Sequence, residues 1–236
     1  MKVLIGCETS GIVRDAFLAR GHDAWSCDLL PADTNTNRHI QDDVLNVINM
    51  DDWDLLMVAH PPCTRLCNSG VRWLSSPPKR LEASYYTDME RAAYAAMNEK
   101  ERLAFMWDGL RKGVKLFSSL WNADVPLVAI ENPVMHKHAK ERIDNFQPHA
   151  QAIQPWQFAK ADETEDNVKK KTCLWLKNLP KLTPTGLLDG STARDECHKA
   201  SPGKDRWKER SKFFPGIADA MADQWGGLTL NRMRAA

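Results

Sequence analysis

The chain alternates between short, continuously apolar runs and longer stretches with helical periodicity. Short apolar runs bounded by Gly or Pro are typical of buried strands, whereas apolar residues three and four apart indicate helices. Strands that are apolar on both faces and alternate with helices predict a parallel sheet covered on each side. We expect strands at residues 2–6, 22–30, 53–59, 125–133 and 172–176, and helices at 10–21, 42–50, 82–95, 99–121 and 215–227.

The composition fits one globular domain. The 236 residues are 43% hydrophobic and carry a formal net charge of +1 at pH 7. Size and composition predict a single domain over 1–236, in which the Pro-, Gly- and Lys-containing residues 177–212 form a long loop. The near-zero net charge gives no global attraction to nucleic acid, so such binding would depend on a local basic patch.

Cysteine content and hydropathy indicate the compartment. Six cysteines in a chain of this length do not suggest a disulfide framework. We expect no secretory leader, because the first apolar run is short and leads into polar sequence. No run approaches the ~20 apolar residues of a membrane span. These features predict a reduced, cytoplasmic protein without a membrane segment.

The strand expected at 53–59 ends in the sequence AHPPC. Proline cannot donate a hydrogen bond to a neighbouring strand, so the strand ends there and Cys63 follows on a loop. Open α/β sheets bind ligands at the carboxyl ends of their strands. A free cysteine is most often a small buried residue, but this position favours a nucleophile.

Cys63 and Cys67 also have the CxxxC spacing of metal ligands. A zinc site would need two further ligands, and the other candidates lie far away in the sequence. Those candidates are Cys173, Cys197 and His198. We therefore predict no metal site.

A carboxylic acid stands at the end of the strand expected at 125–133, which reads IENP. Glu131 at the end of an apolar run is costly to bury unless it has a partner or a function. If the two strands are parallel neighbours, Cys63 and Glu131 lie on one rim. A thiolate that adds to a ring and an acid that protonates that ring suit covalent catalysis.

Polar residues at the ends of the first strands indicate a cofactor site. Asp28 ends the second expected strand, where a carboxylate suits a ribose diol. Asp43 is placed to accept from an adenine amino group; alternatively, Asp42 and Asp43 only cap a helix. The first turn, GCETSG, places Ser10 and Gly11 at a helix start. It lacks the GxGxxG pattern, which disfavours a cofactor bound through a pyrophosphate.

Taken in order, these segments resemble the motifs of the DNA cytosine-5 methyltransferases. HPPC and the later IENP resemble the Pro-Pro-Cys and Glu-Asn motifs of that family. The family's first three cofactor motifs resemble the segments KVLIGCETSGIVRDAF, CDLL and DDVLNVI. Its basic substrate motif resembles KKKTCLWL, and its final motif resembles SKFFPGIADAMADQWGG. The likeness covers most of the chain and is nearest to short bacteriophage-encoded members. It implies an α/β fold with a doubly wound, mostly parallel sheet of the S-adenosylmethionine-dependent methyltransferase (Rossmann-like) type.

The resemblance also implies a reaction, namely methylation of cytosine C5 in DNA with S-adenosylmethionine in the cytoplasm of a bacterial host cell. Cys63 would add to C6 of a flipped-out cytosine, and Glu131 would contact N3 and the exocyclic amine. Cofactor contacts are implied for Cys7, Thr9, Ser10, Gly11, Asp28, Asp43, Val44 and Pro61. Substrate contacts are implied for Arg65, Asn68, Ser69, Lys169, Lys171, Arg206 and Lys208.

The chain departs from the family pattern in ways that keep two alternatives open. CETS replaces the usual Phe and glycines of the first motif, and Pro133 stands where Val is common. Only residues 177–212, with the basic stretch GKDRWKERSK, are available in place of a large target-recognition domain, which leaves room for a partner protein. One alternative is an amino methyltransferase acting on cytosine N4 or adenine N6, in which a thiol has no role. The other is a non-catalytic nucleic-acid-binding or decoy protein with the same fold.

Overall fold

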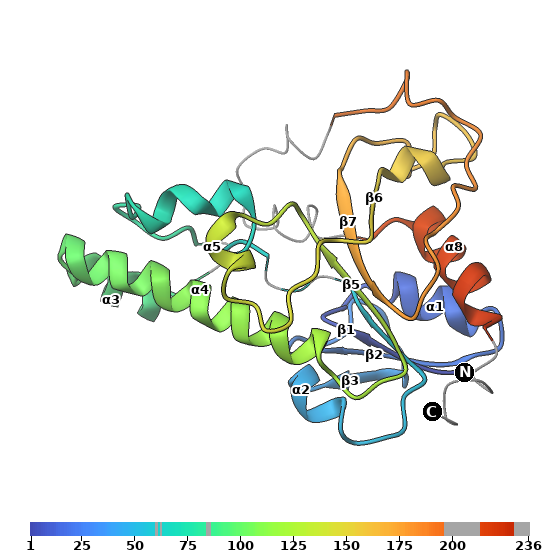
Figure 1. The fold of residues 1–236 in the computed structure, drawn as a ribbon, viewed down its shortest axis with the longest axis horizontal. Coiled ribbons are helices and arrows are strands. Elements are labelled where there is room, and N and C mark those ends of the chain that lie inside the picture. Colours follow the sequence, from blue (N-terminus) through green and yellow to red (C-terminus); the bar gives the residue numbers. More distant parts are fainter. Residues whose placement is uncertain (60, 62, 84–85, 196–212, 229–236) are drawn as a thin grey trace.

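Seven strands form the central sheet: β1 (Lys2–Gly6), β2 (Asp23–Asp28), β3 (His39–Gln41), β4 (Leu55–Val58), β5 (Leu127–Asn132), β6 (Gln151–Ile153) and β7 (Thr172–Lys177) (Figure 1). The computed structural model describes residues 1–236 except 60, 62, 84–85, 196–212 and 229–236. The strand order is β3-β2-β1-β4-β5-β7-β6, and β7 runs antiparallel to both of its neighbours while the other pairs are parallel. The α/β architecture with a doubly wound, mostly parallel sheet is confirmed.

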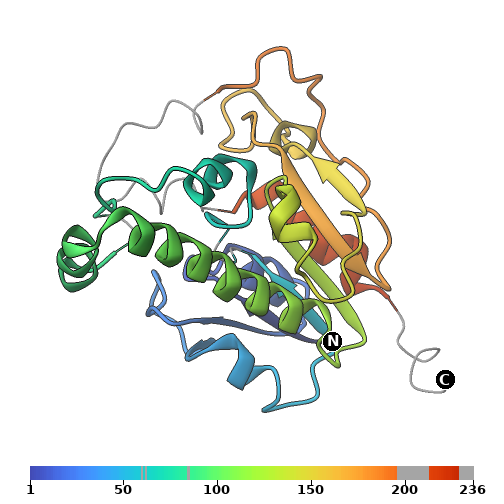
Figure 2. The same ribbon diagram turned by 60° about the vertical axis from the view of Figure 1, so that its left-hand side comes forward.

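Helices cover both faces of this sheet. The α-helices are α1 (Ile12–Leu18), α2 (Val44–Val47), α3 (Asp88–Ala96), α4 (Glu99–Trp121), α5 (Lys137–Lys140) and α8 (Pro215–Gly226), and the 3-10 helices are η1 (Asn68–Leu74) and η2 (Pro155–Phe158). α1 and α8 lie side by side on one face, and α2 and α4 pack on the other (Figures 1 and 2). Within the described part of the chain, none of these helices is long and apolar enough to cross a membrane.

Neighbouring residues of each central strand pack on opposite faces. In β4, Leu55 and Met57 belong to the core under α1 and α8, whereas Leu56 and Val58 belong to the core under α2 and α4. All four side chains are fully buried. Each such burial stabilises the fold by about 1.5–3 kcal/mol before entropy is subtracted. Burial on both faces explains why the strand is a continuous apolar run in the sequence.

The shortest elements were not predicted. β3 and β6 contain three residues each, which is too short for a period of alternation to show. α5 contains four residues and begins where the His136 imidazole accepts the Ala139 N–H at 3.1 Å. In the predicted loop 177–212, the described residues 178–195 contain no helix or strand. Residues 196–212 lie outside the described residues.

The loop that follows β4 packs tightly against α4. Gly109 and Gly113 weaken the intrinsic helix propensity of α4, but they allow this close approach. A Cβ atom on Gly109 would lie 3.2 Å from Arg65 Nε, and one on Gly113 would lie 3.3 Å from Leu66 Cδ2. α4 therefore supports the loop that carries Cys63.

Candidate active site

The carboxyl ends of β1 and β4 lie next to each other in the middle of the sheet. From β1 the chain moves outward to β2 and β3, and from β4 it moves the other way to β5. An open α/β sheet binds ligands at such a reversal, outside the carboxyl ends of its strands. Residues 7–11 follow β1 and residues 59–63 follow β4, so most of the predicted site residues share this carboxyl edge.

Glu8 turns back into the protein and caps α1. It is fully buried and accepts hydrogen bonds from the N–H groups of Val13 (2.8 Å) and Arg14 (3.3 Å). The Ser10 hydroxyl donates a third, at 3.3 Å. Burial raises the pKa of Glu8 to about 7, and these hydrogen bonds oppose the rise. The first N–H groups of a helix often bind phosphate, but here the protein's own carboxylate accepts them. This turn therefore suits a cofactor that is not held through a phosphate.

The backbone of the same turn is tightly constrained. Cys7 has a φ of 57° and Gly11 a φ of 76°. A Cβ atom on Gly11 would lie 2.1 Å from a guanidinium nitrogen of Arg14, so only glycine fits. The Thr9 hydroxyl donates to Asp33 Oδ2 at 3.0 Å. The predicted cofactor residues of this turn thus line a rigid rim whose hydroxyls already have protein partners.

Asp28 lies at the end of β2, half-buried, with apolar neighbours. Its Oδ1 accepts the Leu30 N–H at 2.9 Å, and burial raises the pKa of the carboxyl. The Leu29 side chain is 69% exposed and that of Leu30 43% exposed. A carboxylate beside exposed leucines offers a hydrogen-bond acceptor and an apolar surface for one ligand. The leucines were not predicted as site residues.

Asp43 caps α2, as the alternative reading of the sequence proposed. Its Oδ1 accepts the Leu45 N–H at 2.9 Å. Val44 is buried, and its Cγ2 would lie 2.7 Å from a Cβ atom on Gly6, so α2 packs directly on the end of β1. Pro61, after β4, is also buried. The capping role of Asp43 is observed, and its contact with a cofactor stays a prediction.

Backbone contacts join the loop after β4 to the segment after β5. They are the bonds from Asn68 N–H to Val134 C=O (3.0 Å) and from His136 N–H to Leu66 C=O (3.0 Å), and a bridge between Cys67 and Met135. β4 and β5 are parallel neighbours, with Val58 opposite Ile130. The two segments that carry Cys63 and Glu131 are therefore held together by the main chain.

Cys63 and Cys67 form a thiol pair within this loop. The two thiols share a hydrogen bond, and the Cys67 N–H donates to the Cys63 carbonyl at 3.0 Å. Cys67 Sγ also lies 3.0 Å from Ser69 Oγ, and the Gly70 N–H donates to the Cys67 carbonyl at 3.0 Å. The interaction with Cys63, and after it the groups of Ser69 and Gly70, lower the pKa of Cys67 to about 5, whereas the interaction with Cys67 and burial raise that of Cys63. The pair therefore loses its first proton easily and its second with difficulty.

Glu131 is buried at the end of β5 beside this pair. Burial raises its pKa to about 7, and the charge of Lys170 opposes the rise. Lys170 also lowers the pKa of Cys63, and its Nζ lies 5.2 Å from the centre of the Phe214 ring. Among the residues that the structure describes, none donates a hydrogen bond to the Glu131 carboxylate. A thiol, an acid and a lysine thus gather at one place on the carboxyl edge.

Lys170 was not among the predicted substrate residues, although Lys169 and Lys171 were. The charge of Lys170 acts on both Glu131 and Cys63. The charge of Lys171 acts instead on His149 and Cys173. The sequence motif is therefore near the site, but the lysine that acts on Glu131 and Cys63 is the middle one.

The other predicted substrate residues are spread over the loop. The Arg65 guanidinium donates to the Tyr86 hydroxyl and lies 5.9 Å from the centre of that ring, against α4. Asn68 and Ser69 are exposed at the start of η1. Arg206 and Lys208 lie outside the described residues.

Asn132, next to Glu131, was also missed as a site residue. It is fully buried, and its Nδ2 donates to the Pro133 carbonyl at 2.7 Å. Its Oδ1 has no hydrogen-bond partner among the described residues. The signal for Asn132 was available in the sequence, since it is a polar residue at the end of an apolar run, whereas Glu8 lies in a polar turn and gave no such signal.

The interpretation of this candidate site rests on the positions of its side chains. No family model matches the chain, and no curated protein matches it. Among the described residues, no cluster of three or more His, Cys, Asp or Glu side chains could hold a metal ion. The described part of the carboxyl edge carries two thiols, two buried carboxyls and a lysine.

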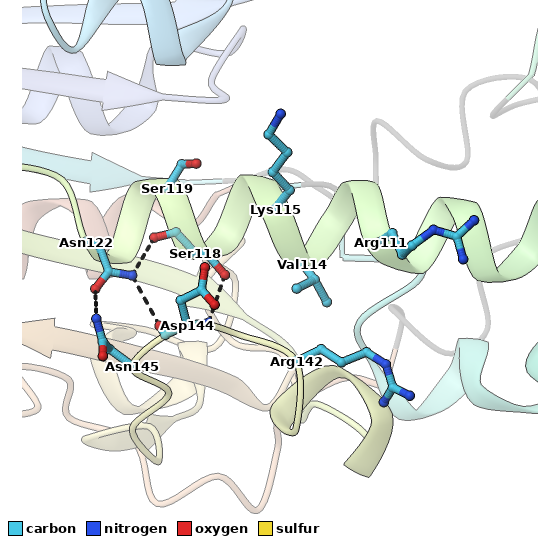
Figure 3. Close-up of a pocket in the computed structure, with 9 residues that line it drawn as sticks. All are labelled: Arg111, Val114, Lys115, Ser118, Ser119, Asn122, Arg142, Asp144 and Asn145. Atoms are coloured by element: carbon cyan, nitrogen blue, oxygen red, sulfur yellow. Dashed lines mark hydrogen bonds between the residues drawn. The ribbon is translucent and has the colours of Figure 1, made fainter.

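A hollow of about 770 Å³ lies away from this edge, between α4 and the segment after α5 (Figure 3). Its polar groups bond mainly to one another: the Ser118 hydroxyl accepts the Asp144 N–H (3.0 Å), and Asn122 Nδ2 donates to the carbonyls of both residues. Figure 3 shows the Lys115 side chain pointing away from them. These bonds tie the segment to the helix, and the hollow adds nothing to the candidate site.

Proposed function

We propose that this protein transfers a methyl group from S-adenosylmethionine to C5 of cytosine in DNA through a covalent adduct with Cys63. One observation carries the proposal: a partly exposed thiol and a buried carboxyl meet at the carboxyl edge of neighbouring parallel strands. The Glu131 carboxylate also raises the pKa of Cys63 through its charge, which supports assigning both groups to one site.

The residues at this edge supply the nucleophile and the acid that such a reaction needs. Cys63 and Cys67 act on each other's ionisation, so the pair carries one negative charge easily, and the reaction uses that charge on the Cys63 sulfur. Attack of Cys63 sulfur on C6 of cytosine opens the C5–C6 double bond and moves an electron pair toward N3. Glu131 has a pKa of about 7, so a large fraction of it is protonated near neutral pH and donates a proton to N3. S-adenosylmethionine supplies the methyl group that C5 accepts. Loss of the C5 proton to a base, departure of the Cys63 thiolate and return of the N3 proton to Glu131 restore the aromatic ring.

The neighbouring half of the edge fits a nucleoside cofactor without phosphates. Glu8 occupies the N-terminus of α1, where a phosphate would bind. Asp28 is placed to accept from ribose hydroxyls, and the exposed Leu29 and Leu30 offer an apolar surface to a flat adenine ring. The mostly parallel sheet also agrees with the resemblance to S-adenosylmethionine-dependent methyltransferases.

DNA is the proposed substrate, and the target base has to leave the stack because C6 is inaccessible inside a duplex. Arg206 and Lys208, in the basic stretch 203–212, are proposed to bind phosphates. A stretch that reads mainly phosphates gives affinity without strong sequence preference. Recognition of a long target would then need a partner protein.

The direct test is incubation of the purified full-length protein with S-adenosylmethionine and mixed-sequence DNA, followed by nucleoside mass spectrometry. We expect 5-methylcytosine from the wild type and none from Cys63→Ser. DNA that contains 5-fluorocytosine should form a covalent complex at Cys63, because fluorine blocks the loss of the C5 substituent. Cys173→Ala, which removes a buried thiol of β7, is the matched control and should keep the activity.

Other products would overturn the proposal in distinct ways. N4-methylcytosine or N6-methyladenine, formed equally by Cys63→Ser, would indicate an amino methyltransferase. Binding of DNA without any methylated product, together with no S-adenosylmethionine binding by calorimetry, would indicate a non-catalytic protein.

A further inference from the structure

Cys67 has a chemical environment that the proposed methyl transfer uses only in part. Methyl transfer needs only one thiol, yet Cys67 places a second sulfur next to that of Cys63. It is buried, with 6% of its surface exposed, and it receives donors from Ser69 and Gly70 in addition to Cys63. Such donors favour a thiolate, and thiolates are the sulfur species that peroxides oxidise.

The backbone holds the two cysteines at a separation that a disulfide can span. The bond from Cys67 N–H to the Cys63 carbonyl closes one helical turn, in which the Cα atoms are about 6 Å apart. Disulfides join Cα atoms separated by roughly 4.4–6.8 Å. The two thiols also act on each other's pKa, as expected of side chains that leave one turn side by side.

We propose that Cys63 and Cys67 are a redox modification site that forms a reversible disulfide when the protein meets a peroxide. The thiolate of the pair attacks the peroxide: an S–O bond forms, the O–O bond breaks, and the departing oxygen takes a proton and leaves as water. The other sulfur then attacks the sulfenic acid, so that an S–S bond forms, the S–O bond breaks, and a second water leaves. Two thiols and one hydrogen peroxide thus give one disulfide and two waters, with the sulfurs oxidised and the peroxide oxygens reduced.

The proposed disulfide is expected to be easily reduced, because it closes a small ring of the main chain. Only three residues separate the two cysteines, and disulfides in strained short loops are more easily reduced than structural ones. A dithiol therefore restores both thiols. If the proposed function is correct, the disulfide also removes the nucleophile, so that methyl transfer stops under oxidation and resumes after reduction.

The sequence between the cysteines offers a direct readout. Trypsin cleaves after Arg65, and no Lys or Arg lies between Arg38 and Arg65, so digestion separates peptides 39–65 and 66–72 with one cysteine each. We would treat the full-length protein with hydrogen peroxide, block free thiols and digest it without reductant. We expect the two peptides to appear as one linked species that dithiothreitol separates. Their persistence as separate peptides, with Cys63 or Cys67 oxidised to sulfinic acid, would overturn the proposal.

Matched variants keep the test specific. Cys67→Ser should give no linked peptide, and its Cys63 should react with dimedone as a sulfenic acid. Cys27→Ala, which removes a buried thiol of β2, should form the linked peptide as the wild type does. If the linked peptide forms but the protein transfers no methyl group, the proposed disulfide is supported and only the proposed function is contradicted. Methyl transfer that persists in fully linked protein would contradict the assignment of Cys63 as its nucleophile.

Discussion

Glu8 and Glu131 are two buried glutamates on the same edge of the sheet, and they differ in their partners. Burial raises the pKa of each to about 7. Glu8 accepts two backbone N–H groups and one hydroxyl, all within its own turn. Glu131 has only the charge of Lys170 in its favour, and no described residue donates a hydrogen bond to its carboxylate.

This difference separates a structural acid from a candidate functional one. A buried carboxyl that is fully hydrogen-bonded stabilises the loop that it caps. A buried carboxyl without such bonds destabilises the fold. Its presence is explained when a ligand completes its hydrogen bonding. A raised pKa alone would not distinguish the two, whereas their hydrogen bonds do.

The largest expected effect is on catalysis. Glu131→Gln keeps the shape of the side chain but removes the acidic proton, so the rate of methyl transfer should fall by about 10²–10⁴-fold. Near neutral pH its free energy of unfolding should be at least that of the wild type, because glutamine brings no charge into the buried site and no described hydrogen bond is lost. Single-turnover kinetics and urea denaturation of the same preparation measure both. Wild-type kinetics in this variant would remove the basis for assigning the two glutamates different roles.

The converse effect is expected for Glu8. Glu8→Ala leaves the N–H groups of Val13 and Arg14 buried without an acceptor, which should reduce the free energy of unfolding by about 1–3 kcal/mol. Glu8→Gln, which keeps one carbonyl acceptor, should be less destabilising. Urea denaturation gives both values. Stability of the alanine variant equal to that of the wild type would show that Glu8 does not maintain the turn.

The pH dependence of stability should not distinguish the two glutamates. An acid whose pKa is higher in the folded than in the unfolded chain keeps its proton longer when folded. The free energy of unfolding therefore falls as pH rises from the ordinary value of 4.5 to about 7. Glu8→Gln and Glu131→Gln should each flatten this decline in urea titrations at a series of pH values. A decline that becomes steeper in either variant would contradict the sign of that shift.

The smallest expected effect is electrostatic and concerns Lys170. Lys170→Met removes a charge that lowers the pKa of Glu131, so this pKa should rise further while that of Glu8 stays unchanged. Carboxyl carbon-13 NMR of protein labelled at glutamate follows both acids in one titration. Lys171→Met is the matched control, because the charge of Lys171 acts on His149 and Cys173. Equal shifts of the Glu131 pKa in both variants would contradict the assignment of Lys170 as the lysine that acts on Glu131.

Local sequence determined the main strands, their succession along the chain and the residues at their ends. Apolar runs and prolines are properties of a few consecutive residues, so the positions of Cys63 after β4 and of Glu131 at the end of β5 followed from the pattern alone. The sheet then confirmed that these two strands are parallel neighbours. The two shortest strands, β3 and β6, were not predicted, because three residues are too few to show an alternation of apolar and polar positions.

Tertiary structure decided which polar groups act on one another. The role of Glu8 depends on the turn at Cys7, which directs the carboxylate into α1. The contact between Cys67 and Cys63 depends on one hydrogen-bonded turn of a loop, and the role of Lys170 depends on how the chain before β7 lies against the ends of β4 and β5. Each of these outcomes is set by backbone dihedrals and long-range packing, which residue types and their spacing do not specify.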